Sequence, residues 1–135
     1  MKKAFLLTCL SVITLAGIPE NKQILILPIN EPIEPFESLW RATCIVESNN
    51  NPLAVNVGEK AFGIVQIRPI LLRDYYNRTG IRYESEDCFS VEISKEIFMF
   101  YASKFHYWEQ EQISKKWNGR GKGNIEYLAK VKKHL

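Results

Sequence analysis

One glutamate in this chain has the position and the surroundings of a general acid. Reading back from Glu47, apolar or small residues recur every three or four positions, which is the spacing of one face of an amphipathic helix. These residues are Phe36, Leu39, Trp40, Thr43 and Cys44. Glu47 is the next position on that inward face, and three asparagines and Pro52 end the helix soon after it.

Burial changes the chemistry of such a carboxyl group. Desolvation disfavours the charged form and raises the pKa, so a buried Glu47 would stay protonated near neutral pH. A protonated carboxyl group in that range can donate its proton to a substrate. The competing interpretation is a glutamate that reaches back to solvent or caps a neighbouring helix.

The segment 53–67 predicts a small β-hairpin. It is short, rich in β-branched residues and interrupted by glycines, which favours an irregular β-element over a helix. Gly58 suits the turn, and Gly63 suits a place where the backbone passes close to another segment. Gln66 interrupts an apolar run, so its amide needs partners. It either bonds nearby backbone or binds substrate beside Glu47.

Helices are expected over the rest of the chain. Pro69 opens one that Gly80 ends, and a long helix follows Asp87 to Ser90. A short helix is predicted over 109–116, and a last one begins near Asn124, a residue type that caps helices. The expected inner faces are Ile93, Ile97, Phe98, Tyr101, Ala102 and Phe105 in the long helix, and Leu128, Val131 and Leu135 in the last. The pattern predicts an α+β, mostly α-helical domain.

Residues 1–17 have the layout of a secretory signal peptide. Two lysines and an apolar run over 4–15 precede small residues at the expected cleavage point. The run is too short for a comfortable membrane span. Cys9 raises a lipid-anchored alternative, which is less favoured because Thr8 is a poor neighbour for lipidation. We therefore expect export to the periplasm.

The remaining chain predicts an extended arm over 18–35 and one domain over 36–135. Prolines at 28, 32 and 35 prevent a longer regular element in the arm. The 18 Lys and Arg residues nearly balance the 15 Asp and Glu residues, and two lysines leave with the leader. No basic stripe or tract appears before the C-terminus, which argues against nucleic acid as a partner. The lysines at 130, 132 and 133 suit a solvated helix end, where cations complement the helix dipole.

Two cysteines would remain after the leader is removed, Cys44 and Cys88. In an oxidising periplasm they could form a disulfide, and two buried free thiols are equally consistent with the sequence. Neither has a second Cys or His at metal-ligand spacing, and His106 and His134 stand alone. We therefore expect no zinc site and no cofactor.

Three segments stand in an order that is typical of one enzyme family. The first is Glu47-Ser48 with its asparagine-rich turn. The second, 61–69, reads Ala-Phe-Gly-Ile-Val-Gln-Ile-Arg-Pro, and the third, 117–121, reads Trp-Asn-Gly-Arg-Gly. With these segments the chain resembles the lysozyme-like lytic transglycosylases, a group related in fold to goose-type lysozyme. The resemblance covers 36–135 and implies a lysozyme-like domain with a small β-hairpin element.

The resemblance also implies roles for individual residues. Glu47 would be the catalytic acid, and Gln66 would line the glycan groove near it. Trp117 and Asn118 would close the cleft around the acid. Trp117 stands where the family usually has tyrosine, which keeps an aromatic wall but loses a phenol hydroxyl near the acid. The substrate-binding residues implied in this way are Ser48, Gly63, Gln66, Trp117 and Asn118.

The implied activity is that of a peptidoglycan lytic transglycosylase. Such an enzyme cleaves the β-1,4 bond between MurNAc and GlcNAc with a single glutamate as acid and base, and leaves 1,6-anhydro-MurNAc ends. The expected partners are peptidoglycan strands and a secretion or conjugation machine. A hydrolytic lysozyme is one alternative, with Glu59 or Asp74 guiding a water molecule. A non-catalytic glycan-binding protein of the same fold is the other.

Overall fold

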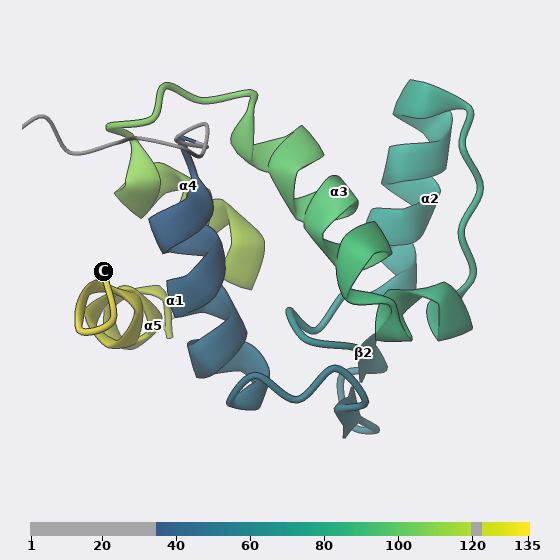
Figure 1. The fold of residues 1–135 in the computed structure, drawn as a ribbon, viewed down its shortest axis with the longest axis horizontal. Coiled ribbons are helices and arrows are strands. Elements are labelled where there is room, and N and C mark those ends of the chain that lie inside the picture. Colours follow the sequence, from purple (N-terminus) through teal and green to yellow (C-terminus); the bar gives the residue numbers. More distant parts are fainter. Residues whose placement is uncertain (1–34, 120–122) are drawn as a thin grey trace, which may run out of the picture. The chain divides into compact units, whose positions relative to one another are not determined.

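The computed structural model describes residues 35–119 and 123–135, which all belong to one unit of the chain, Pro32–Leu135. The elements are α1 (Glu37–Ser48), β1 (Val55–Asn56), β2 (Ala61–Phe62), α2 (Pro69–Thr79), the 3-10 helix η1 (Ser85–Phe89), α3 (Val91–Ala102), α4 (Gln110–Asn118) and α5 (Asn124–Lys132). The unit is mostly helical with a small two-stranded sheet (Figure 1), which confirms the predicted α+β composition. The predicted signal peptide, Cys9 and all but the last residue of the arm lie outside the described residues.

Helix α1 has the predicted inward face. Its buried residues are Leu39, Trp40, Ala42, Thr43 and Cys44. The helix ends after Ser48 because Asn49 and Asn50 both take the left-handed conformation, with φ of 52° and 62°. Asparagine adopts this conformation more readily than other residues with a side chain. The early end of the helix leaves Glu47 in its last turn.

The predicted hairpin is confirmed as an antiparallel pair of two-residue strands, in which Val55 lies opposite Phe62. Beyond β2, Phe62 and Ile67 exchange backbone hydrogen bonds of 2.9 and 2.8 Å, which closes a tight loop between them. Within that loop, Gly63 has φ of 78°, and a Cβ atom there would overlap the carbonyl oxygen of Cys88. Its predicted role at a close backbone approach is therefore confirmed.

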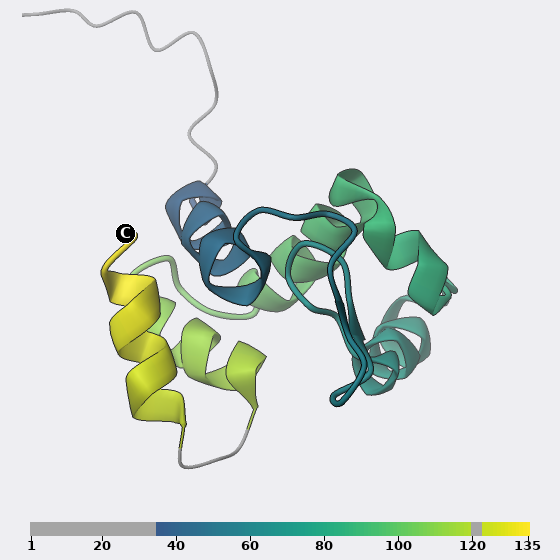
Figure 2. The same ribbon diagram turned by 90° about the horizontal axis from the view of Figure 1, so that it is seen from below.

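One apolar core joins the helices. Trp40 of α1 packs edge-on against Phe98 of α3 at 5.4 Å between ring centroids, and Phe98 packs against Trp117 of α4 at 4.9 Å. Helix α5 lies against α1 and α4, as both ribbon views show (Figures 1 and 2). The hairpin connects the end of α1 to the start of α2, and the loop at 62–67 runs from β2 toward the start of α2.

The last two helices differ in detail from the prediction. Helix α4 continues through Asn118, because Gly119, with φ of 89°, is the first residue that leaves the helical conformation. Helix α5 turns Tyr127 and Val131 into the core, whereas Leu135 is 49% exposed. The prediction that Leu135 packs inward was wrong, because the pair spaced by four residues, Tyr127 and Val131, defines the buried face.

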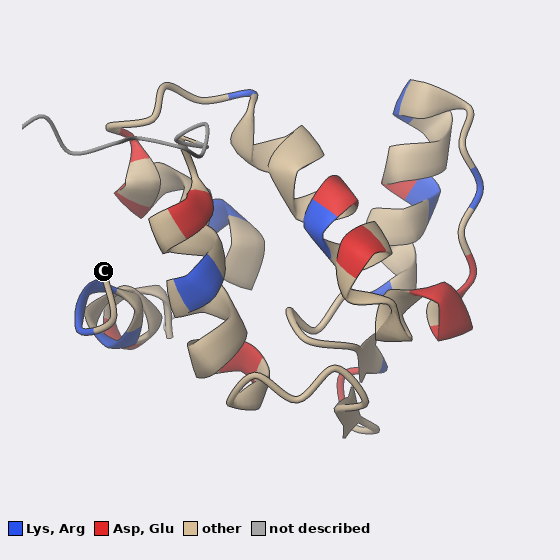
Figure 3. Ribbon diagram, viewed as in Figure 1, with Lys and Arg blue, Asp and Glu red and all other residues tan. Residues whose placement is uncertain are grey.

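Charged residues of both signs lie on the same helices (Figure 3). Several form exposed pairs four residues apart, such as Arg41 with Glu37 and Lys130 with Glu126. Cys44 and Cys88 are both buried free thiols, and burial raises the pKa of each to about 12. Over the part of the chain that the structure describes, no helix has the length and apolar character needed to cross a membrane.

Candidate active site

Glu47 lies in the wall of a cavity of about 310 Å³. The cavity is bounded by the end of α1, the hairpin, Gln66, the end of α4 and helix α5. These segments are far apart in the sequence, so the folded chain alone brings them together. Most of the side chains in the wall are polar, which suits a ligand rich in hydroxyl and amide groups.

The carboxyl group of Glu47 has an unusual pKa, raised from 4.5 to about 7. Burial is the largest cause, because it removes water from the charged form. The nearby negative charge of Glu59 acts in the same direction. A hydrogen bond from Tyr127 and the positive charge of Arg68 oppose the shift. Both protonation states of Glu47 are therefore populated near neutral pH. The sequence predicted the direction of this shift, but it predicted a group that stays protonated in that range.

Tyr127 is the direct partner of this carboxyl group. Its hydroxyl donates a hydrogen bond of 2.8 Å to Oε1 of Glu47, across 80 residues of sequence. Tyr127 is buried in α5, and desolvation together with the charge of Glu47 raises its own pKa, so it stays a donor. The expectation that Trp117 leaves the acid without a phenol hydroxyl is thus corrected, because a different helix supplies one.

Gln66 faces the same cavity from a strained backbone position. Its φ is 55°, in the left-handed region that residues with a side chain rarely adopt. The side-chain amide donates to the carbonyl of Gly63 at 2.9 Å and to that of Ala54 at 3.3 Å. The first interpretation is confirmed, since the amide bonds nearby backbone. Gln66 also lines the cavity with Glu47, and its hydrogen bond to a substrate stays a prediction.

Asn118 reaches the cavity from the end of α4. Its side-chain amide donates to Oδ1 of Asn124 at 2.8 Å, which fixes the start of α5. Its carbonyl accepts a hydrogen bond of 3.2 Å from Nη2 of Arg68. Arg68 therefore ties the end of α4 to the loop at 62–67, and its charge acts on Glu47.

Ser48, Gly63 and Trp117 hold the walls in place and do not line this cavity. The Ser48 hydroxyl lies 2.7 Å from the carbonyl oxygen of Ile64 and joins the end of α1 to the loop. The Trp117 indole donates to the carbonyl of Val65 at 3.0 Å and joins α4 to the same loop. Trp117 faces a neighbouring cavity instead. A direct contact of these three residues with substrate stays a prediction.

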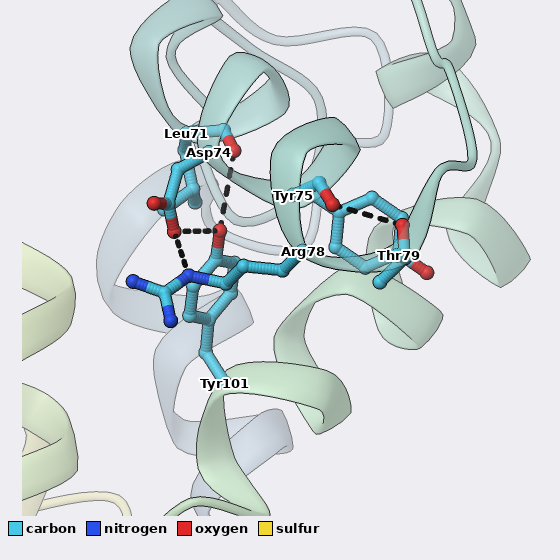
Figure 4. Close-up of polar contacts among 6 residues, drawn as sticks. All are labelled: Leu71, Asp74, Tyr75, Arg78, Thr79 and Tyr101. Carbon is cyan, nitrogen blue, oxygen red and sulfur yellow. Dashed lines mark hydrogen bonds and ion pairs between the residues drawn. The ribbon is translucent and has the colours of Figure 1, made fainter.

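The two candidates for a second carboxylate occupy different places. Glu59 is exposed in the hairpin and lines the cavity of Glu47. Asp74 lies in the neighbouring cavity, where its Oδ2 atom accepts hydrogen bonds of 2.7 Å from both Arg78 and Tyr101 (Figure 4). These bonds, that of Arg78 first, lower the pKa of Asp74. Of these two candidates, Glu59 lies in the wall beside Glu47. A further carboxylate of the same wall, Glu126 of α5, pairs with Lys130.

Two residues that shape the site had no role in the sequence analysis, Tyr127 and Arg68. The four-residue spacing of Tyr127 and Val131 is a signal that Tyr127 lies on a buried helix face. Leu128 and Leu135, however, offer an equally apolar face. Arg68 lies two residues after Gln66, and nothing in the local spacing indicates where its side chain points. Among residues 35–119 and 123–135, no three His, Cys, Asp or Glu side chains are grouped to hold a metal ion.

Comparisons with protein-family models, with curated proteins and with solved structures each find no match for this chain. The cavity of Glu47 combines one carboxyl group that titrates near pH 7, a hydroxyl donor that orients it, and amide side chains from two further segments. This arrangement can exchange a proton with a polar ligand and hold that ligand by hydrogen bonds.

Proposed function

We propose that this protein has a lysozyme-like fold and acts as a peptidoglycan lytic transglycosylase, with Glu47 as its only acid and base. The observation that carries the proposal is the oriented carboxyl group of Glu47, which has a pKa of about 7 and receives the 2.8 Å bond from Tyr127. Cleavage of a glycosidic bond needs a proton donor that is protonated at working pH. Gln66 and Asn118 would bind the sugars beside it.

The proposed reaction balances with one carboxyl group. Protonated Glu47 gives its proton to the glycosidic oxygen as the bond from that oxygen to C1 of MurNAc breaks. The carboxylate then takes the proton of the 6-hydroxyl of the same MurNAc residue, whose oxygen bonds to C1. The product is a 1,6-anhydro ring, and no water is consumed. A pKa near 7 suits both steps, since the group must be acid first and base second.

Mass spectrometry of the products tests this proposal. Residues 18–135 are incubated with purified sacculi beside the variant Glu47→Gln, which keeps the size of the side chain and cannot be a proton donor of this kind. We expect muropeptides lighter by one water from the wild type, and a loss of about a thousandfold or more in the variant. Full activity of Glu47→Gln would refute the role of Glu47.

A hydrolytic lysozyme is the second candidate, and the position of Glu59 favours it. Glu59 lines the same cavity as Glu47, so it could guide a water molecule to C1. Reducing ends among the products, together with their loss in Glu59→Gln, would establish this alternative. Binding without cleavage would instead leave the glycan-binding protein.

The cellular part of the proposal concerns export and partners. We infer a periplasmic protein from the leader at 1–17, and a role in opening the wall for a secretion or conjugation machine. These statements depend on the sequence and on the proposed activity alone. Unimpaired transfer in a deletion strain would remove the role in secretion or conjugation without affecting the enzymatic assignment.

A further inference from the structure

A second and larger cavity, of about 650 Å³, lies between α2, α3 and α4. Apolar side chains form much of its wall, among them Leu71, Phe105, Ile113 and Trp117. It shares no lining residue with the cavity of Glu47. Consecutive residues at the end of α4 line the two cavities, Trp117 the larger one and Asn118 the smaller one.

The charges at this larger cavity are unbalanced. Its one carboxylate, Asp74, accepts hydrogen bonds from Arg78 and Tyr101 (Figure 4), and the charge of Lys116 acts on it as well. Two further cations, Lys104 and Lys116, belong to the wall and have exposed side chains. Neither forms an ion pair with a described residue, although the Lys104 ammonium lies 4.1 Å from the centre of the Phe100 ring. The cavity therefore presents an apolar floor with two ammonium groups at its edge.

This combination fits a ligand with small apolar groups and carboxylates. A bare glycan chain is a poor match, because its hydroxyl groups gain little from apolar walls. An acidic peptide rich in alanine matches both features. Its methyl groups would contact the floor, and its carboxylates would reach the two lysines.

We propose that the larger cavity binds the stem peptide that peptidoglycan carries on its muramic acid residues. The inference rests on the proposed function, since it assumes that the glycan strand occupies the cavity of Glu47. The stem peptide leaves the strand at the muramic acid residue, which is the sugar that Glu47 acts on. A peptide that leaves the strand there would pass the end of α4 at Trp117 and enter the larger cavity.

The test compares two substrates and a charge-reversed variant. The substrates are intact sacculi and glycan strands freed of their peptides by an amidase. The variant carries Lys104→Glu and Lys116→Glu, and both side chains are exposed, so the fold tolerates the change. The matched control carries Arg73→Glu and Lys133→Glu, which change the net charge equally at exposed positions outside both cavities.

We expect kcat/KM of the Lys104 and Lys116 variant to fall by about tenfold or more on intact sacculi and to stay within about twofold on peptide-free strands. The control variant should match the wild type on both. An equal loss on both substrates would overturn the proposal, because the cavity would then bind glycan. An unchanged rate on intact sacculi would overturn it as well.

A binding measurement separates this proposal from the proposed function. Stem peptides released by the amidase are titrated by calorimetry into the Glu47→Gln protein, with and without the two lysine substitutions. Binding that disappears with Lys104→Glu and Lys116→Glu supports the peptide site even if no substrate is ever cleaved. Cleavage of sacculi without any peptide binding would refute the peptide site and leave the transglycosylase assignment intact.

Discussion

Glu47 and Tyr127 form one functional unit at the scale of single residues. Burial raises the pKa of the carboxyl group, because it disfavours the charged form. The bond from the Tyr127 hydroxyl and the charge of Arg68 favour the carboxylate and oppose that rise, and the resulting pKa is about 7. The pair therefore sets the pH at which the group changes from acid to base. The hydroxyl also limits the carboxyl group to one orientation toward the cavity.

Substituting Tyr127→Phe tests that unit. In the wild type, the hydrogen bond from Tyr127 lowers the pKa of Glu47. The variant loses this bond, so we expect the pKa of Glu47 to be higher in the variant. The decline of kcat/KM that accompanies deprotonation of Glu47 should then occur at a higher pH than in the wild type. The rate near pH 7 should drop by about tenfold, because the carboxyl group loses its orientation. Initial rates on sacculi, measured from pH 5 to 9, would check both effects.

Tyr76→Phe is the matched control, since Tyr76 is 47% exposed on α2 and lines neither cavity. It should reproduce the wild-type profile in rate and in pH. If kcat/KM of Tyr127→Phe declined at the same pH as in the wild type, the proposed effect of Tyr127 on the pKa of Glu47 would be contradicted. A lower rate with no shift in pH would restrict the role of Tyr127 to orientation.

At the scale of elements, the loop at 62–67 positions the site. Three contacts from different segments hold it: Ser48 at the end of α1, Trp117 of α4, and the close packing of Gly63 on η1. Gln66 in this loop lines the cavity, and Arg68, just after the loop, acts on Glu47 through its charge. Any change that displaces this loop should affect the site without touching Glu47.

Three glycine-to-alanine variants measure how tightly the loop is held. Gly63→Ala should lower the free energy of unfolding by about 3 kcal/mol or more, because the new methyl group overlaps the Cys88 carbonyl and φ is 78°. Gly80→Ala has φ of 75° but open space, so about 1 kcal/mol is expected. Gly58→Ala, in ordinary contact only, should stay within about 0.5 kcal/mol. Urea unfolding would rank the three variants, and a small effect at Gly63 would contradict the close packing.

The elements could be predicted from local patterns. The three- and four-residue spacing in α1 predicts both the helix and the inward position of Glu47. The three asparagines predict where this helix ends. Gly63 was assigned correctly because a glycine before an apolar run has few other roles. The C-terminal end of α4 could not be predicted from local pattern, since Trp117 and Asn118 are compatible with either a helix or a turn.

The partner of Glu47 could not be predicted in the same way. Tyr127 is 80 residues away, and helix α5 has apolar residues on more than one face. Only packing against α1 and α4 decides that Tyr127 and Val131 turn inward. The same holds for Arg68, whose contact with Asn118 spans 50 residues. Local sequence limits which residues a helix can bury, and tertiary packing selects among them.

At the scale of the whole molecule, the cavity of Glu47 makes folding depend on pH. The group has a pKa of about 7 in the folded protein and 4.5 without the fold. Between these values the unfolded chain gives up the proton and the folded protein keeps it. Folding then binds a proton, so the stability contributed by Glu47 is fully present below pH 4.5 and is lost as pH rises through 7.

The variant Glu47→Gln should reveal this dependence directly. The free energy of unfolding of the wild type, minus that of the variant, should be constant below about pH 4 and fall between pH 4.5 and 7. The fall should level off above about pH 8, at a total of at most about 3 kcal/mol. Urea unfolding at half-unit pH steps would give this difference curve.

Glu92→Gln gives a control of opposite sign. The pKa of Glu92 is lowered by hydrogen bonds from its own backbone and from Ser90, so its contribution is present above pH 4.5 and lost as pH falls. The free energy of unfolding of the wild type minus that of Glu92→Gln should therefore be constant above about pH 4.5 and should decrease as the pH falls below that value. Parallel curves for wild type and Glu47→Gln from pH 4.5 to 8 would mean that the carboxyl group is not desolvated on folding. The proposed general acid would then lose its physical basis, because an exposed Glu47 would be ionised at neutral pH.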